Sequence, residues 1–268
     1  LWGVPMIVLL LGTHIYLTIR LKFPQRYIFK AIRLSVKRDK ESTGDVSQFS
    51  ALATSLAGTI GTGNIIGVAT AVTMGGPGAV FWCWMTGVLG IATKYAEGLL
   101  AVKYRVQTED GKMLGGPMYA LERGLGCRWL GWTFAFCTIV ASFFIGNMIQ
   151  CNSISMLLEE GYHISPFATG ITIALLTCAV IMFGVKGIAR VCEGLVPFMA
   201  VFYVGGCLWL LGVNHAYVWP ALRLIVTDAF SPQAATGGFV GASMMIAMRY
   251  GIARGLFSNE SGLGSAPI

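Results

Sequence analysis

Charge is scarce along this chain. Only 12% of its 268 residues are charged, whereas 55% are hydrophobic; an ordinary soluble domain is roughly one quarter charged. The mean hydropathy is +0.70. This composition excludes a water-soluble globular domain and predicts an all-α integral membrane protein, with the lipid bilayer as its first partner.

Residues that build metal sites and catalytic sites are also few. The sequence has three histidines and contains neither a CxxC nor an HExxH motif, so we expect no metal site of the zinc type. The seven cysteines are odd in number and lie mostly in apolar runs, where we interpret them as small core residues. No nucleophile with a base is visible at membrane depth. We therefore expect neither an enzyme nor an organic cofactor.

Seven apolar runs are long enough to cross a bilayer, which takes about 20 apolar residues. They lie at 2–19, 49–73, 78–102, 129–157, 166–185, 191–212 and 236–257. The chain opens on Leu1 rather than Met and stops at Ile268, so we expect a fragment of a longer protein. We expect no cleavable signal peptide, because the first run lacks a basic segment before it and a small-residue cleavage site.

The basic residues gather on one side of these crossings: eight Lys or Arg in 20–48, five in 103–128 and two in 186–190. The loops on the other side carry one, Arg223. The positive-inside rule then predicts a multi-pass protein of the cell membrane with its N-terminus outside and its basic loops in the cytoplasm. This placement explains the net charge of +7 without a nucleic-acid partner.

Two loops are expected to hold helices of their own. In 20–48, aromatic and aliphatic residues alternate loosely with basic ones, which indicates an amphipathic helix on the inner leaflet. The extracellular loop 213–235 contains Trp219, Pro220 and Pro232 and could hold a short helix over the outer mouth.

A glycine cluster interrupts the second run. Residues 58–64 read GTIGTGN, with glycine at every second or third position, which predicts a helix broken near 58–63. In hydrocarbon, such a break is tolerated only where it is buried in protein or lines a cavity. The alternative is that these glycines only allow close helix packing.

The break predicts a ligand site. Freed amides of Thr62, Gly63 and Asn64 would begin an outer half-helix, whose positive dipole end can hold a carboxylate. The carbonyls of Ala57 and Ile60 would end the inner half-helix and could coordinate Na⁺ as part of a site. One turn of backbone could thus bind both the carboxylate of a zwitterion and a cation.

The seventh run is a second candidate for a broken helix. It carries clustered glycines and continues into Ser258-Asn259-Glu260-Ser261-Gly262. Two broken helices of opposite direction, five crossings apart, are what an inverted repeat predicts for a secondary transporter. Within this run Met248 and Gly251 could line a small apolar pocket, although ordinary core is an equal reading.

Amides at membrane depth are further candidates. Gln150 lies in the fourth run, where an unbonded amide would cost several kcal/mol, so it is either a substrate ligand or a bond between helices. We favour a ligand for Gln150. Lys94 and Glu97 lie near the inner end of the third run, where we expect them to neutralise each other.

Three stretches resemble a known family. Residues 75–90, GGPGAVFWCWMTGVLG, look like the signature of the sodium:alanine symporters, the alanine or glycine:cation symporter family. GTGN at 61–64 and GLFSNESGLGSAP at 255–267 are also similar to blocks of that family. Cys83 stands where the family more often has Met.

That resemblance implies an eleven-helix fold with the LeuT-type five-plus-five inverted repeat. Residues 1–19 would be an extra first helix, 49–212 the first repeat, and 236–268 the broken first helix of an incomplete second repeat. The resemblance implies that Thr62, Gly63 and Asn64 take the substrate carboxylate, that Gln150 faces the amino acid, and that the carbonyls of Ala57 and Ile60 form part of a sodium site.

The function that follows is symport of Na⁺ with a small neutral amino acid, alanine or glycine, by alternating access. An H⁺-coupled amino acid transporter is the closest alternative. An ion channel is a more distant one, because a channel needs a continuous pore lined by rings of charge or carbonyls.

Overall fold

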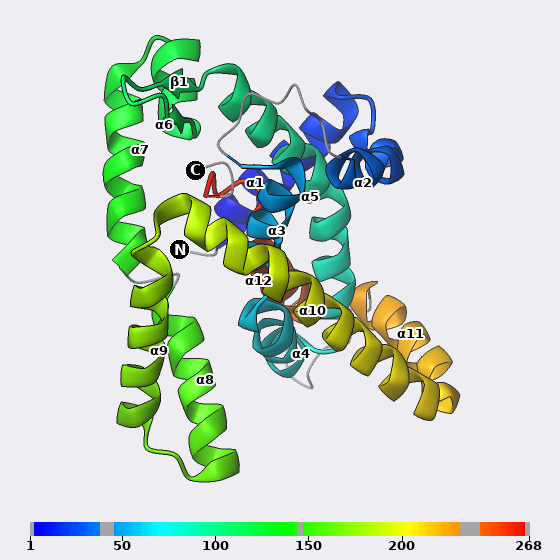
Figure 1. The fold of residues 1–268 in the computed structure, drawn as a ribbon. Helices are drawn as coiled ribbons and strands as arrows, with labels where there is room; N and C mark the ends of the chain where they lie inside the picture. Colours follow the sequence, from blue (N-terminus) through cyan, green and yellow to red (C-terminus); the bar gives the residue numbers. More distant parts are fainter. Residues whose placement is uncertain (1–2, 38–45, 144–146, 231–241, 266–268) are drawn as a thin grey trace. The chain divides into compact units, whose positions relative to one another are not determined.

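The computed structural model describes residues 3–37, 46–143, 147–230 and 242–265. These residues form an all-α protein, with one two-stranded antiparallel hairpin in which Val106 pairs with Leu114 and Gln107 with Met113 (Figure 1). The elements are α1 Val4–Arg20, η1 Pro24–Tyr27, α2 Ile28–Val36, α3 Gln48–Thr59, η2 Gly63–Gly67, α4 Val68–Gly75, α5 Gly78–Lys103, β1 Val106–Gln107, β2 Met113–Leu114, α6 Pro117–Tyr119, η3 Ala120–Gly124, α7 Arg128–Ala141, α8 Asn147–Tyr162, α9 Pro166–Ile181, α10 Gly184–Val213, α11 His215–Phe230 and α12 Ala242–Asn259.

By length and composition, α10 is the one helix in the described ranges that could cross a membrane alone. There are up to three spans if two bent pairs each count as one, Pro5–Arg20 with Pro24–Val36 and Gln48–Thr59 with Gly63–Gly75. Fewer segments meet this test than the seven expected crossings. Some of the other helices are too short to cross a membrane alone; α9, for example, is apolar but has 16 residues.

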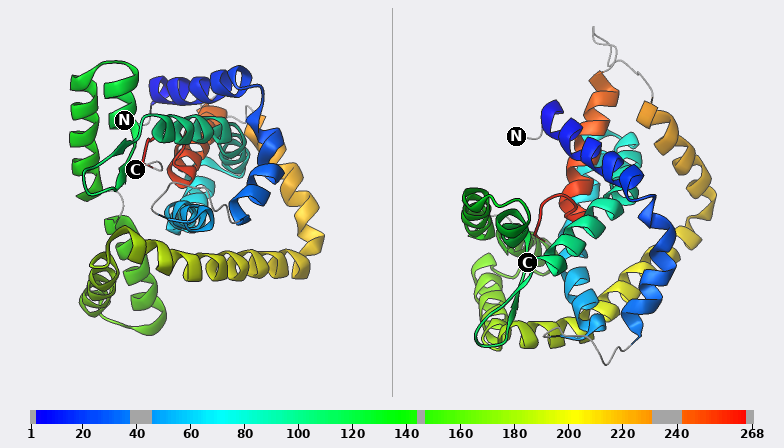
Figure 2. Two further views of the ribbon diagram at one scale, coloured as in Figure 1. Left: turned by 45° about the horizontal axis from the view of Figure 1, so that its top comes forward. Right: turned by 90° about the horizontal axis from the view of Figure 1, so that it is seen from above.

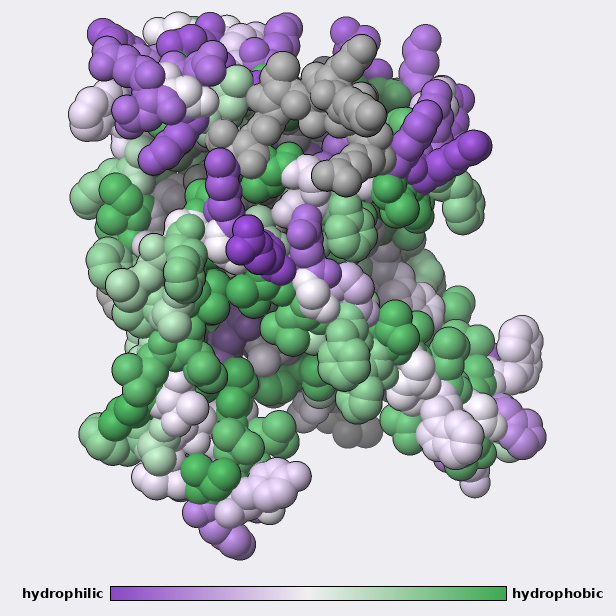
Figure 3. Space-filling model, viewed as in Figure 1, coloured by the Kyte–Doolittle hydropathy of each residue, from purple (hydrophilic) through white to green (hydrophobic). Residues whose placement is uncertain are grey.

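Apolar side chains cover much of the surface of these helices, as Figure 3 shows. On α10, for example, Phe198, Phe202 and Trp209 are exposed, and Phe29 of α2 is 85% exposed. A soluble protein would bury such side chains, whereas hydrocarbon is a favourable environment for them. The exposure agrees with a chain that resides in a bilayer.

The chain divides into two compact units. The first comprises Leu1–Ile32, Thr59–Gly98 and Phe198–Ala266, and the second comprises Arg33–Gly58, Leu99–Pro197 and Pro267–Ile268. In the second unit α8 lies beside α9, where the Ser155 hydroxyl donates to the carbonyl of Pro166 at 3.4 Å. The same unit holds an ion pair of 3.0 Å between Arg128 and Glu122.

In the first unit α12 packs against α1, α4 and α5 (Figure 2). Its core consists of Ile7 and Leu10 from α1 with Ile252 and Leu256 from α12. In a bilayer such contacts are stabilised mainly by van der Waals packing, because lipid tails are as apolar as these side chains. This packing fixes one face of α12 and leaves other faces for α4 and α5.

Two glycines bring α12 close to α5. A Cβ at Gly251 would overlap the carbonyl oxygen of Ala79, and a Cβ at Gly255 would overlap Oγ1 of Thr86. Their spacing of four residues puts both on the same helix face. This is close packing of the small-xxx-small kind that membrane helices use.

The N-terminus of α5 is capped from α11. The Gly78 N–H donates to Oδ2 of Asp228 at 2.8 Å, and the rings of Phe81, Trp82 and Phe230 pack together beside this bond. A carboxylate is favourable at the positive end of a helix dipole. The aspartate therefore ties α11 to the start of α5.

Candidate functional site

The helix that begins at Gln48 is interrupted where the glycine cluster lies. The structure has α3 ending at Thr59, bends at Ile60 and Gly61, and a π-helical segment from Gly63 to Gly67 that leads into α4. Single π-helical turns occur frequently at functional sites because they displace the backbone hydrogen-bond ladder. Ala57 lies in the last turn of α3, where carbonyl groups lack partners inside the helix.

Asn64 holds the interruption in shape. Its backbone N–H donates to the carbonyl of Gly61 at 3.0 Å, and its side-chain Nδ2 donates to the carbonyl of Thr59 at 2.7 Å. The side-chain amide thus binds the carbonyl of the residue at which α3 ends.

The end of α12 meets the interruption after α3 at this residue. The hydroxyl of Ser258, one residue before the end of α12, donates to Oδ1 of Asn64. A Cβ at Gly63 would lie 3.5 Å from the ring of Phe257 and 3.7 Å from Cα of Ser258. Residues 63–64 and 257–258 therefore face each other.

Beyond Asn259 the chain leaves helical geometry. Glu260, Gly262 and Gly264 have φ of 54°, 88° and 71°, and the Ser261 N–H donates to Oδ1 of Asn259 at 2.9 Å. Positive φ suits glycine but is strained for glutamate. In the described residues α12 is continuous through Gly251 and Gly255 and ends in this tight turn, so an interruption of the last run remains a prediction. Its upstream glycines, Gly237, Gly238 and Gly241, lie outside the described residues.

Lys94 and Glu97 bind this turn rather than each other. Lys94 Nζ donates to the carbonyl of Asn259 at 3.0 Å. Glu97 Oε1 accepts the N–H groups of Gly262 at 3.0 Å and Gly264 at 3.3 Å. The two charges still attract each other, but no direct ion pair joins the lysine and the glutamate in the structure described. Each charged group instead binds backbone groups at the end of α12 or in the turn that follows it.

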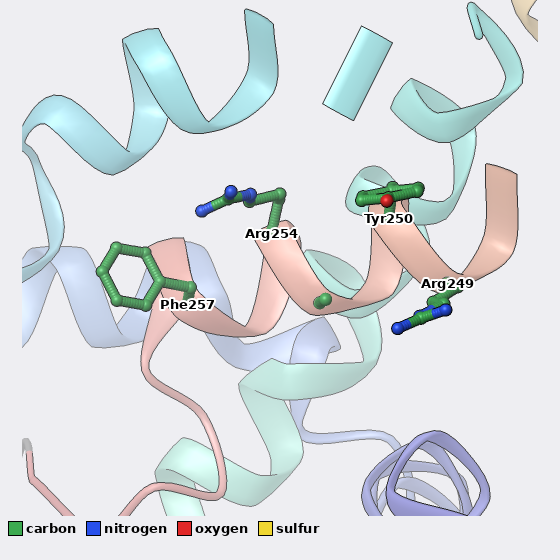
Figure 4. Close-up of a pocket in the computed structure, with 5 residues that line it drawn as sticks. Arg249, Tyr250, Arg254 and Phe257 are labelled. Atoms are coloured by element: carbon green, nitrogen blue, oxygen red, sulfur yellow. The ribbon is translucent and has the colours of Figure 1, made fainter. Parts of the chain in front are cut away.

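A cavity of about 270 Å³ lies along α12. It is lined by Arg249, Tyr250, Ala253, Arg254 and Phe257. In Figure 4, Arg254 and Tyr250 extend from one side of α12 and Arg249 from the other. The Cδ of Arg254 lies 3.9 Å from the position of a Cβ on Gly67, which places the cavity beside η2.

The two arginines were missed by the sequence reasoning. The sequence does contain a signal for them, since both lie in the apolar run 236–257. Ionisable residues inside a membrane crossing are costly and mark functional sites. Phe257 and Ser258 were also missed as site residues, since only the fold brings them to Asn64.

The remaining predicted site residues have different surroundings. Met248 packs against the core of the first unit together with Leu11 and Trp82. Gly251 is buried against α5, as described above, so packing explains why this position is glycine. Gln150 is exposed on α8 in the second unit. Thr62 precedes η2 as its N-terminal cap residue.

Comparison with known proteins identifies relatives along the whole chain. The model of the sodium:alanine symporter family matches residues 1–268. An uncharacterised transporter of Haemophilus influenzae is 53% identical over all of this chain and 59% of its own length. The sodium/alanine symporter AgcS of Methanococcus maripaludis is 48% identical over all of this chain and 60% of its own length.

A third relative, the probable sodium/glutamine symporter GlnT of Bacillus subtilis, is 38% identical over all of this chain and 55% of its own length. The chain therefore spans between 55% and 60% of the length of these relatives. The family and its symporter-named relatives are transporters, not enzymes.

Proposed function

The chain belongs to the sodium:alanine symporter family, and on this premise we propose that it forms part of a membrane symporter that couples Na⁺ entry to uptake of a small neutral amino acid. The protein works by alternating access, in which two states expose one central site to opposite sides of the membrane. Its fold is the LeuT-type five-plus-five inverted repeat. Its N-terminus lies outside, and its basic loops are cytoplasmic.

The bond between Ser258 and Asn64 is the observation that carries this proposal. It joins the interruption after α3 to the last turn of α12. The N–H groups of Thr62 and Gly63 at the start of η2 bind the carboxylate, since the first N–H groups of a helix have no partner within it. Asn64 holds these two groups in place through its bonds to the carbonyls of Gly61 and Thr59.

The coupling ion binds on the other side of the interruption. Ala57 and Ile60 offer backbone carbonyl oxygens at the end of α3, and hard cations take oxygen ligands. The partial negative charge at a helix C-terminus favours a cation there. The name of AgcS includes sodium, which supports Na⁺ as the ion.

The substrate is short because the ring of Phe257 lies against Gly63. A Cβ at Gly63 would already be in van der Waals contact with that ring at 3.5 Å, so little room remains for a long substrate side chain at this point. Alanine and glycine fit such a site. The name of GlnT includes glutamine. Competition by glutamine therefore tests whether the site accepts a longer side chain.

The test is uptake of labelled alanine into proteoliposomes that contain the full-length protein. We expect saturable uptake that requires an inward Na⁺ gradient, with unlabelled glycine competing better than glutamine. Uptake driven by a pH gradient without Na⁺ would favour H⁺ coupling, and a non-saturating current would favour a channel; either result would contradict the proposal.

A further inference from the structure

The segment that follows α1 is basic and carries no acidic residue. Residues 3–37 contain six Lys or Arg and no Asp or Glu. The six basic residues are all exposed: Arg20, Lys22, Arg26, Lys30, Arg33 and Lys37. None of them forms an ion pair with another residue that the structure describes. The described part of the chain therefore offers this positive charge no acidic partner.

A bend of fixed direction separates α1 from η1 and α2. The two sides of the bend meet at 63°, and between them Lys22 and Phe23 adopt left-handed φ angles of 56° and 58°. Such angles are unfavourable for residues other than glycine and persist where surrounding contacts hold them. One such contact is the bond from Gln25 Nε2 to the carbonyl of Val88 on α5, at 3.0 Å. The contacts of the fold thus set the direction in which α2 leaves α1.

The bend suits a helix that lies in the surface of a bilayer. α1 has 17 residues and is therefore about 26 Å long, close to the roughly 30 Å of a hydrocarbon core. Membrane helices tilt by up to about 40° from the bilayer normal. If α1 tilts by about 27°, which is within this range, the bend of 63° brings α2 parallel to the bilayer surface.

α2 has an apolar face with a basic face beside it. Phe29, Ile32 and Val36 are spaced by three and four residues, so they share one face of the helix, and all three are exposed. Lys30 and Arg33 lie on the neighbouring face, about 100° away around the helix axis. No residue described in α2 is buried. An apolar face flanked by Lys and Arg is typical of helices that lie in the headgroup layer.

We propose that α2 is a binding site for anionic phospholipids. Phe29, Ile32 and Val36 insert among the upper acyl chains of the adjoining leaflet, and Lys30 and Arg33 bind phosphate oxygens of the headgroups. Long basic side chains reach from the edge of an apolar face to the headgroups. Ammonium and guanidinium groups both form charge-assisted hydrogen bonds to phosphate.

Charge complementarity selects anionic lipids over zwitterionic ones. Clusters of roughly four to eight Lys or Arg next to a membrane helix attract anionic headgroups, and this segment supplies six. A zwitterionic headgroup carries no net charge and gains little from such a cluster. The apolar face selects a lipid over a water-soluble anion, because its side chains are stabilised by leaving water.

The experiment places a fluorophore on the apolar face and identifies the lipid that contacts it. Full-length protein with its native cysteines replaced carries Phe29→Cys, labelled with NBD, in nanodiscs of phosphatidylcholine and phosphatidylglycerol. Quenching by a spin label on the upper acyl chain of phosphatidylglycerol is compared with quenching by the same label on phosphatidylcholine at equal mole fraction. We expect both lipids to quench, and phosphatidylglycerol to quench at least about threefold more efficiently at low salt. High salt should reduce this preference.

Two double variants test the role of the basic face. Lys30→Gln with Arg33→Gln should lower the preference for phosphatidylglycerol at least about twofold, whereas quenching by both lipids persists because the apolar face is unchanged. Lys186→Gln with Arg190→Gln is the matched control, since these residues are also an exposed Lys and Arg but lie on α10. This control should leave the preference unchanged.

Three results would overturn the proposal. Quenching by neither lipid would mean that protein covers Phe29, either another part of the full-length chain or a second copy. Equal quenching by both lipids would show that α2 does not select anionic headgroups. An unchanged preference in Lys30→Gln with Arg33→Gln would place the selection elsewhere. Because the measurement uses neither Na⁺ nor an amino acid, a failure of the proposed transport function would leave it unaffected.

Discussion

Ser258 donates a hydrogen bond to the side-chain oxygen of Asn64, a residue 194 positions earlier in the chain. The same asparagine donates to the carbonyl of Thr59 at 2.7 Å. One amide thus connects the end of α3, the start of η2 and the end of α12. We therefore expect a displacement of any of these three segments to displace the other two, as a site that opens and closes requires.

Asn64→Ala removes its bonds to two partly buried groups, the carbonyl of Thr59 and the hydroxyl of Ser258. We expect alanine affinity to fall by about 1–3 kcal/mol, measured by calorimetric titration of the purified full-length protein in Na⁺. Ser258→Ala should weaken binding by less. Because the two residues share a bond, the double variant should lose less than the sum of the single losses. Additive losses would show that the bond does not matter for binding.

A larger side chain at Gly63 should weaken alanine binding because it meets the ring of Phe257. Gly63→Ala adds a Cβ at 3.5 Å from the ring, an ordinary contact, so we expect less than about a tenfold loss of affinity. Gly63→Val has to displace the ring and should lose more than that. Gly12→Val is the matched control, since nothing lies within 4 Å of a Cβ at Gly12. Unchanged uptake in Gly63→Val would remove this residue from the pocket.

Gly251 and Gly255 are expected to act on stability. Gly251→Ala and Gly255→Ala each force α12 away from α5 and should lower the free energy of unfolding by about 1–3 kcal/mol, read from thermal unfolding in detergent. Gly87→Ala, on α5 with open space around its Cβ position, should be neutral. If Gly251→Ala instead weakens alanine binding at full stability, Gly251 belongs to the site as the sequence suggested.

Asp228 should stabilise the start of α5. Asp228→Ala removes the acceptor of the Gly78 N–H and should cost about 1 kcal/mol of unfolding free energy. Arg223→Gln should cost nothing measurable, because Asp228 is bonded to the helix end and not to that arginine. Equal losses in both variants would mean that an ion pair matters more than the cap.

Gln150 remains a predicted ligand. It is exposed on α8, so its substitution should leave stability unchanged. If it faces the amino acid, Gln150→Ala should weaken alanine binding by about 1–3 kcal/mol. Asn152→Ala on the same helix is the control, since its Nδ2 contacts only Met156 Sδ at 3.5 Å. Wild-type alanine affinity in Gln150→Ala would exclude Gln150 from the substrate site.

The sequence could predict the helix interruption because its cause is local. Glycine has a low helix propensity, and three glycines within 58–63 act on the backbone of that segment alone. The turn at residues 260–264 has the same kind of cause, since Gly262 and Gly264 adopt positive φ. The amphipathic pattern in 20–48 likewise coincides with a helix, α2.

Contacts between distant segments could not be predicted in this way. The sequence suggested Lys94, three residues away, as the partner of Glu97, and the fold adds the N–H of Gly262, 165 positions further on. Met248 and Gly251 remain predicted pocket residues, and only the fold shows that Met248 packs against the core of the first unit and that Gly251 lies against α5. Phe257 and Ser258 were overlooked for the converse reason, since their importance comes from lying against residues 63 and 64.

The most direct test of the central claim is protection of the interruption by substrate. In the full-length protein with its native cysteines replaced, Thr62→Cys introduces a thiol beside the free amides of η2, and its rate of modification by a water-soluble maleimide is measured. We predict that alanine slows the reaction at least about tenfold in Na⁺ and has little effect when choline replaces Na⁺. Equal rates with and without alanine in Na⁺, in a protein that still binds alanine, would contradict the account.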